Sequence, residues 1–348
     1  MEDHQSQAGL QSRSAPTPMS LLVRQIRFEA VGINSFELVH PTGEALPAVT
    51  AGAHIDMHLA GGVIRQYSLC NNPGERHRYV IAVLREEVGR GGSRLMHESL
   101  RVQDVVSVSQ PRNNFSLISD AKKHILLAGG IGVTPLKAMA HYLESTGEDY
   151  ELHYCAKGQE HAAFREEFAA QVEKGRVIFH FDGGNPRDGL DIVALLAAHV
   201  EGTHVYYCGP GGFMAACAKA AQHWPRGTVH FEHFKAPDPV KSEVVSVDAI
   251  SDATSDAASE VAGGFSVQIA STGALIAIPD DKSIVEALAD SGVVIETSCQ
   301  SGLCGTCKLR YLSGEVDHRD FILSDDEHLE YLTACVSRPK SKLLVLDL

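Results

Sequence analysis

Four cysteines near the end of the chain have a spacing that suits iron–sulfur chemistry. They are Cys299, Cys304, Cys307 and Cys335. C-x4-C-x2-C followed by a distant fourth cysteine is the plant-type pattern of a [2Fe–2S] cluster. Gly302 and Gly305 give the loop the freedom to fold around inorganic sulfide. Structural zinc, which usually takes two separated C-x2-C pairs, and a disulfide pair are the alternatives. The spacing predicts a [2Fe–2S] site.

Two glycine-rich turns have the composition of a nucleotide site. The first, in HILLAGGIGVTPLKAM, joins an apolar strand to a helix that we expect Thr134 to cap, with Pro135 at its first position. The second turn follows a later strand and contains Cys208, Gly209, Pro210, Gly211 and Gly212. Glycines at a helix N-terminus let a pyrophosphate approach the backbone. One such turn is also compatible with a plain connection, but two at strand ends of one sheet favour a nucleotide.

A strand and a loop in the first third of the chain have features of a second cofactor site. The strand contains Arg65, Gln66, Tyr67 and Ser68, with Arg65 and Tyr67 on one face. The arginine suits a phosphate and the aromatic ring suits a flat cofactor, although an ordinary half-buried strand is the alternative. The loop GRGGS, residues 89–93, opens a short helix and is a candidate anion site.

The predicted nucleotide and iron–sulfur sites together require an electron carrier between them. A nicotinamide nucleotide delivers two electrons together as hydride, whereas a [2Fe–2S] cluster accepts one at a time. A flavin commonly performs this conversion. The first third of the chain is the part left to hold it.

The elements that must position these residues change character along the chain. Six short alternating segments within residues 21–108 predict an antiparallel barrel or sandwich. From residue 124, strands alternate with expected helices at 134–146, 161–174, 189–200 and 211–224, which predicts a doubly wound α/β domain. Residues 265–348 begin with two strands and a helix. We expect residues 1–20 to be a flexible tail and residues 236–264 to be a linker.

The charge limits the possible partners. The net charge of the 348 residues is −14, which argues against nucleic acid or an anionic membrane. Residues 265–348 contain 13 acidic and seven basic side chains, which predicts either a solvated surface or one that attracts a basic protein. No apolar run reaches the roughly 20 residues of a membrane span, and the start lacks a secretory signal. We expect a cytoplasmic protein.

The motifs in this order resemble the phthalate dioxygenase reductase family of the ferredoxin–NADP reductase superfamily. The resemblance extends from Leu21 to Leu348. It implies a six-stranded antiparallel flavin barrel at 21–118, a doubly wound NAD domain at 119–235 and an α+β β-grasp ferredoxin domain at 265–348. The bound flavin is expected to be FMN rather than FAD.

The resemblance also assigns roles to residues. The FMN-binding residues that it implies are Arg65, Gln66, Tyr67, Ser68, Gly91, Gly92 and Ser93. For NADH it implies Gly130, Gly132, Thr134, Pro135, Cys208, Gly209 and Pro210. The expected catalytic residues, at the meeting of flavin and nicotinamide, are Ser68, Thr134, Cys208, Glu232 and Phe234. Asp182 is expected to face the adenine ribose and to favour NADH, although Lys157 and Arg187 suit the 2′-phosphate of NADPH.

The resemblance finally implies a function. Electrons from NADH are expected to pass through FMN and the [2Fe–2S] cluster to a separate Rieske-type oxygenase or demethylase of aromatic compounds. The partner is expected to dock at the acidic ferredoxin domain, with the reductase as a monomer. The alternatives are another acceptor (a carnitine- or choline-type monooxygenase, ferric iron or a quinone) and an iron–sulfur redox sensor.

Overall fold

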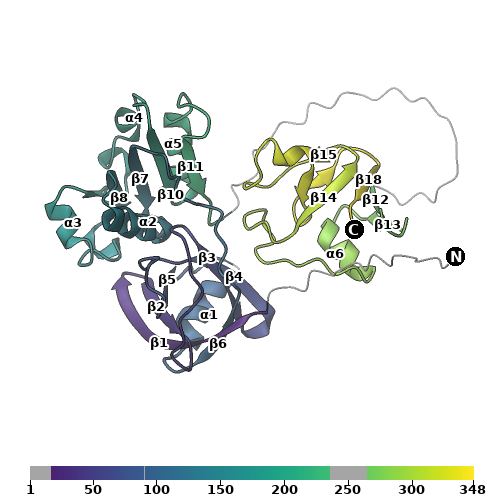
Figure 1. The fold of residues 1–348 in the computed structure, drawn as a ribbon, viewed down its shortest axis with the longest axis horizontal. Helices are drawn as coiled ribbons and strands as arrows, with labels where there is room; N and C mark the ends of the chain where they lie inside the picture. The colour runs from purple at the N-terminus through teal and green to yellow at the C-terminus, as the bar shows by residue number, and fades with distance from the viewer. Residues whose placement is uncertain (1–16, 90, 236–264) are drawn as a thin grey trace, which may run out of the picture.

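The structure is a computed structural model that describes residues 17–89, 91–235 and 265–348 (Figure 1). The expected linker at 236–264 and most of the expected tail lie outside the described residues. The first strand begins at Met19, inside the segment predicted to be the tail. Three larger sheets, of six, five and five strands, follow one another along the chain.

The first sheet has the predicted antiparallel, barrel-like pattern. Its strands are β1 (Met19–Ala30), β2 (Ile33–Val39), β3 (His54–Leu59), β4 (Val63–Ser68), β5 (Tyr79–Leu84) and β6 (Val105–Val108). They pair in the order β4-β3-β6-β1-β2-β5, and every pair is antiparallel. Alternate side chains such as Leu21, Val23 and Ile55 are fully buried, as the period of a strand requires. Helix α1 (Gly92–Ser99) packs against β3, β4 and β5.

The second sheet is parallel and covered on both faces. Its strands are β7 (Lys123–Gly129), β8 (Tyr150–Ala156), β9 (Val177–Phe181), β10 (Thr203–Cys208) and β11 (Val229–Glu232), in the order β11-β10-β7-β8-β9. In β7, Leu126 shares a core with helix α2 (Val133–Thr146), whereas Leu127 shares a core with α5 (Gly211–Ala220). The strand order reverses between β7 and β10, and ligands bind at such a switch point.

Besides α5, which ends at Ala220 rather than at 224, two predicted helices of this domain are much shorter than expected. The segment 161–174 forms only α3 (Ala169–Glu173), because Phe164 has a positive φ of 63° that a helix does not accept. The segment 189–200 forms only α4 (Ile192–Leu195), which begins where the Asp191 side chain accepts a hydrogen bond from the Ala194 N–H. Both predictions were wrong in length because local turn geometry interrupts an apolar helical pattern.

The third sheet mixes parallel and antiparallel pairs around one helix. Its strands are β12 (Phe265–Ile269), β13 (Leu275–Ile278), β14 (Lys308–Ser313), β16 (Tyr331–Thr333) and β18 (Leu343–Leu346), in the order β13-β12-β18-β14-β16. Only β12 and β18 run parallel. Helix α6 (Ile284–Asp290) begins with a capping box between Ser283 and Glu286. This arrangement is a β-grasp.

The remaining elements are short. A two-stranded pair consists of β15 (Val316–Asp317) and β17 (Arg338–Pro339). The 3-10 turns are η1 (Ala60–Gly62), η2 (Gly130–Gly132), η3 (Gln159–His161), η4 (Pro186–Asp188) and η5 (Glu327–Leu329). No helix in the described ranges is long and apolar enough to cross a membrane.

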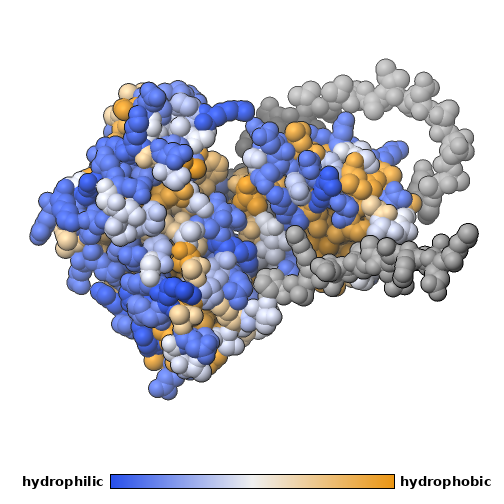
Figure 2. All heavy atoms as spheres, viewed as in Figure 1, coloured by the Kyte–Doolittle hydropathy of each residue, from blue (hydrophilic) through white to orange (hydrophobic). Residues whose placement is uncertain are grey.

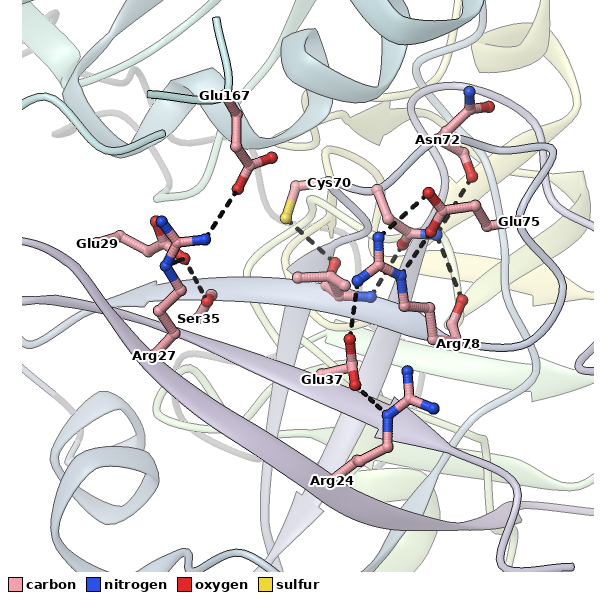
Figure 3. A network of polar contacts seen from close by, with 12 residues as sticks. Arg24, Arg27, Glu29, Ser35, Glu37, Cys70, Asn72, Glu75, Arg78 and Glu167 are labelled. Atoms are coloured by element: carbon pink, nitrogen blue, oxygen red, sulfur yellow. Dashed lines mark hydrogen bonds and ion pairs between the residues drawn. The ribbon is translucent and has the colours of Figure 1, made fainter. Parts of the chain in front are cut away.

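A network of charged side chains lies on the barrel beside the nucleotide domain (Figure 3). Glu37 is held between Arg24 and Arg78, with 2.8 Å from its carboxylate to Arg78. Burial raises the pKa of Glu37, but the hydrogen bonds from both arginines outweigh this effect and lower it. The carboxylate therefore stays charged at neutral pH.

One buried lysine connects the two domains. Lys137, on α2, is 3% exposed, and its Nζ donates to the Cys70 carbonyl of the barrel at 3.0 Å. The same ammonium pairs with Glu167 at 2.8 Å, and Glu167 lies 3.8 Å from Arg27 of β1. Buried charges persist only when they are paired in this way. The helix that follows the first glycine-rich turn is thereby fixed against the barrel.

Candidate functional site: a flavin, nucleotide and iron–sulfur assembly

The structure brings the four spaced cysteines together as two pairs. The Cys299 thiol lies beside that of Cys304, and the Cys307 thiol lies beside that of Cys335. Cys304 and Cys307 are buried, and the other two are half-buried. The neighbouring Cys299 thiol lowers the pKa of the Cys304 thiol. Two thiol pairs match the demand of a [2Fe–2S] cluster, in which each iron takes two protein ligands.

The backbone of the cysteine loop is shaped for sulfur. The N–H groups of Ser301 and Leu303 point at Cys299 Sγ, at 3.4 and 3.3 Å. Gly302 has a positive φ of 69°, and a Cβ there would meet the Asp320 backbone at 3.0 Å, so only glycine fits. Such N–H groups stabilise negative charge on cluster sulfurs. The donors and the geometry fit the cluster.

A guanidinium and a helix N-terminus meet on the barrel. A Cβ on Gly92 would lie 2.4 Å from Arg65 Cγ, so the Arg65 side chain lies directly over the start of α1. Gly91 caps this helix with a left-handed φ of 78°, and Ser93 Oγ accepts the Glu86 N–H at 3.1 Å. An arginine beside the N–H groups at the start of a helix is a strong phosphate site. These residues fit the phosphate of a flavin mononucleotide.

The rest of the strand offers groups for a flat ring. Tyr67 is half-buried against the barrel core, and burial raises its pKa, so the phenol keeps its proton. Gln66 Oε1 is buried and has no hydrogen-bond partner among the described residues. A buried acceptor without a partner costs free energy unless a ligand supplies a donor. This orphaned oxygen is consistent with a bound cofactor.

A buried carboxyl connects the barrel with the end of the parallel sheet. Ser68 Oγ donates to Glu232 at 3.2 Å across the domain boundary. Cys208 lies opposite Glu232 in the register of β10 and β11. Burial raises the pKa of Glu232 to about 7, and proximity to Glu232 adds to the burial that raises the pKa of Cys208. Three of the predicted catalytic residues therefore lie together where the two domains meet.

Glu232→Gln is expected to flatten the pH dependence of stability of the flavin-free protein. The folded-state pKa of about 7 exceeds the ordinary value of 4.5, so folding binds a proton between these values and wild-type stability falls as the pH rises through them. Glutamine resembles the protonated carboxyl and keeps the stability that wild type loses, roughly 3 kcal/mol. Thermal unfolding at pH 5 and pH 8 measures the difference, with Glu201→Gln at an exposed turn as control. Parallel profiles for wild type and Glu232→Gln would contradict this expectation.

The two glycine-rich turns lie in direct contact at the switch point. A Cβ on Gly132 would meet the Cys208 carbonyl oxygen at 2.2 Å. Helix α2 starts at Val133, so Thr134 is not its cap as predicted. The Thr134 hydroxyl instead donates to the Ile131 carbonyl at 3.1 Å. Pro135 lies in the first turn, where its missing N–H does no harm. The turns after β7 and β10 form one cradle.

The other predicted residues follow the carboxyl ends of strands in the same sheet. Gly130 has a left-handed φ of 54°, and Gly209 and Pro210 follow β10 directly. Asp182 follows β9, and its carboxylate accepts the Gly184 N–H at 2.7 Å. Phe234 is 40% exposed just beyond β11, so it presents a ring that a cofactor can cover.

Two residues beside the site were missed by the sequence analysis. His54 is fully buried, pairs in register with Ser68, and lies 4.0 Å from Glu232. Burial lowers its pKa to about 4, so the imidazole is neutral. Asn114 Nδ2 donates to the Cys304 carbonyl at 3.1 Å, from the segment after the barrel to the cysteine loop. A buried histidine in an alternating strand was a signal for His54, whereas nothing local marked Asn114.

Comparison with known proteins agrees with this architecture. The 2Fe-2S iron-sulfur cluster binding domain family matches residues 267–340. The chain is 54% identical to a tert-butanol monooxygenase / tert-amyl alcohol desaturase reductase subunit of Aquincola tertiaricarbonis, over 95% of this chain and 96% of that protein. It is 42% identical to a vanillate O-demethylase oxidoreductase of a Pseudomonas species, over 95% of this chain and 100% of that protein.

A solved structure of phthalate dioxygenase reductase gives the same result. It covers 95% of this chain and 98% of its own length at 39% identity, with a TM-score of 0.68. That protein is described as a modular structure for electron transfer from pyridine nucleotides to [2Fe-2S]. The expected three-part fold is confirmed, and so is the expectation of an oxidoreductase that serves an oxygenase. The chain belongs to the phthalate dioxygenase reductase family.

Proposed function

We propose that the chain takes electrons from NADH into FMN and passes them through a [2Fe–2S] cluster to a separate oxygenase. Three units divide this work: residues 21–118 hold FMN, residues 119–235 bind NADH and residues 265–348 hold the cluster. When bound, the flavin converts a hydride into single electrons. The observation that carries the proposal is the contact of Ser68 with Glu232 at 3.2 Å, which places the barrel and the nucleotide cradle around one point.

The cluster loop also lies close to the other two units. In Figure 1 the ferredoxin domain lies beside both of them. Asn114 bonds to the cysteine loop at the Cys304 carbonyl, and the His233 ring lies edge-on to Phe321, at 5.5 Å between ring centroids. His233 is the neighbour of Glu232. This arrangement supports direct electron transfer within one chain.

Arg65→Ala is expected to weaken FMN binding by roughly 10–100-fold, because a charge-assisted bond to phosphate contributes about 1.5–3 kcal/mol. Arg65→Lys keeps the charge but loses the planar fork, so its affinity should lie between the two. Fluorescence titration of the flavin-free protein with FMN measures both variants. Riboflavin, which lacks the phosphate, should bind wild type and Arg65→Ala alike. Equal weakening for riboflavin would show that Arg65 acts on the fold rather than on the phosphate.

Anaerobic titration of the purified protein with NADH tests the proposed function. We expect loss of the flavin absorbance and a rhombic [2Fe–2S] EPR signal in the same sample. Loss of the flavin absorbance without an EPR signal from the cluster would contradict the proposed electron transfer from flavin to cluster. Reaction with NADPH but not NADH would overturn the role proposed for Asp182. Steady reduction of cytochrome c by NADH separates this enzyme from an iron–sulfur sensor, which would turn over slowly or not at all.

The surface of the ferredoxin domain is proposed as the docking site of the oxygenase. Besides its acidic side chains, this domain exposes large apolar ones, and hydrophobic residues gather on it in Figure 2. Among the exposed apolar residues of this domain are Leu275, Val294, Leu312, Leu329 and Leu343. Apolar side chains within a charged surface are typical of protein interaction sites. A fall in oxygenase reduction with rising salt, at a constant rate of flavin reduction, tests the electrostatic part.

A second candidate partner follows from the comparisons. Identity to the reductase subunit of a tert-butanol monooxygenase is 54%, against 42% for a vanillate demethylase oxidoreductase. An oxygenase of small branched alcohols is therefore a second candidate partner, in addition to an aromatic oxygenase or demethylase. Reconstitution of the reductase with each oxygenase, scored by substrate consumed per NADH oxidised, decides between them.

A further inference from the structure

Two histidines and an aspartate that the proposed function does not use converge next to the cysteine loop. His318 follows β15, His328 lies in η5, and Asp320 lies between them in sequence. One ligand atom from each, a ring nitrogen or a carboxylate oxygen, lies within 4.8 Å of the other two. Imidazole nitrogen and carboxylate oxygen are the donors that divalent transition metals take from proteins.

Asp320 is held in the orientation that a ligand requires. Its side chain is fully buried, and Oδ1 accepts the N–H groups of Ile322 at 3.3 Å and Leu323 at 2.9 Å. The other oxygen, Oδ2, faces His328 Nε2 at 3.1 Å. Two ligand atoms at this separation subtend about 95° at an ion roughly 2.1 Å from each. The backbone bonds to Oδ1 are the outer-shell support that metal-binding carboxylates usually have.

His318 contributes an unsatisfied nitrogen. Its Nδ1 is buried and has no hydrogen-bond partner within the described part of the chain. The His318 ring stacks on His328 at 4.1 Å between centroids and 26° between planes. A buried ring nitrogen without a partner costs free energy that a bound ion removes. The His328 side chain is 26% exposed, so the site keeps a side open to solvent for water ligands.

We propose that His318, Asp320 and His328 bind a divalent transition-metal ion, with Zn²⁺ as the ion to test. Three protein ligands and open positions are a known zinc and iron arrangement. The surrounding residues 265–348 contain 13 acidic and seven basic side chains, and this excess of negative charge attracts cations. This site is separate from the four cysteines, and its binding reaction does not depend on the proposed electron transfer.

The ion would lie next to the cluster loop. The Phe321 N–H, one residue after Asp320, donates to the Gly302 carbonyl at 3.0 Å. A dication there stabilises negative charge nearby, so the potential of the reduced cluster should shift in the positive direction. The expected shift in the reduction potential of the cluster rests on the proposed function, whereas the binding of zinc does not.

Calorimetric titration of the chelator-treated holoprotein with Zn²⁺ tests the site. Iron and acid-labile sulfide are measured before and after, so that zinc at the cysteines is recognised by loss of iron. We expect one Zn²⁺ per chain with the iron content unchanged. No bound zinc in wild type, or zinc bound only as iron is lost, would overturn the proposal.

Variants assign the ion to its ligands. His318→Ala and His328→Gln should each weaken zinc binding by more than about 100-fold, since loss of an outer-shell partner alone weakens it roughly 10–100-fold. Glutamine at 328 keeps a hydrogen-bond donor for Asp320, and the visible spectrum of the cluster shows that each variant is folded. His77→Ala, an exposed histidine of the barrel, is the control and should bind as wild type does. Unchanged affinity in both ligand variants would refute the site.

Paramagnetic Ni²⁺ gives an independent location. Ni²⁺ bound at this site should speed the spin relaxation of the reduced cluster, so that its EPR signal saturates at higher microwave power than with Zn²⁺. The difference should vanish in His328→Gln. A difference that persists in this variant would place the ion elsewhere.

Discussion

Replacement of Cys335 with alanine is expected to abolish the iron–sulfur signal and to reduce NADH-dependent cytochrome c reduction by more than about 100-fold. Cys335 and Cys307 form one of the two thiol pairs, so the variant leaves one iron with a single protein ligand. Loss of an outer-shell partner alone costs roughly 10–100-fold in affinity or activity, and loss of a ligand costs more. Bleaching of the flavin by NADH should keep its wild-type rate, because Cys335 lies in a different unit of the chain.

The matched control is Cys217→Ala. Cys217 is buried in α5 of the nucleotide domain and belongs to its core, so its removal changes the thiol count without touching the cluster. Iron content, EPR signal and cytochrome c reduction should remain. If Cys335→Ala retained a rhombic signal and full cytochrome c reduction, the ligand assignment would be wrong.

The iron–sulfur part was predictable from the sequence because its chemistry is local. Three of the four ligands lie within nine residues, and their spacing alone limits what can bind. The barrel was predictable in class because alternation reports strands with one buried face. The parallel sheet was predictable because runs such as HILLA are buried on both faces. Each of these signals is contained in a short segment of chain.

The centre of the site was not predictable from composition or periodicity. Ser68 and Glu232 are 164 residues apart and meet only because two domains pack together. Their joint role came from a family resemblance, and His54 escaped because its pairing with Ser68 depends on a register that no local signal fixes. The metal group of His318, Asp320 and His328 was missed for a similar reason, since two of its members lie ten residues apart on different elements.

The nucleotide cradle gives the second large effect. Gly132→Ala is expected to slow flavin reduction by NADH roughly 100-fold, because about 1 Å of misplacement costs that much in a reaction that depends on orientation. The added methyl would lie 2.2 Å from the Cys208 oxygen and 2.7 Å from the Gly209 nitrogen. Both are backbone atoms, so neither can rotate away, and the turns after β7 and β10 must separate. The strain should also lower stability by about 1–3 kcal/mol.

Stopped-flow absorbance under anaerobic conditions measures this rate, and thermal unfolding measures the stability. Gly74→Ala is the matched control: Gly74 lies in the barrel without a positive φ, and its Cβ would have its nearest neighbour at 3.4 Å. Reduction of the Gly132→Ala flavin by dithionite should remain complete, since the flavin site lies on the barrel. A Gly132→Ala protein that NADH reduces at the wild-type rate would show that the contact of the two turns does not position the nucleotide. The residues that position the nucleotide would then have to lie at the carboxyl ends of β8 and β9, and Asp182 follows β9.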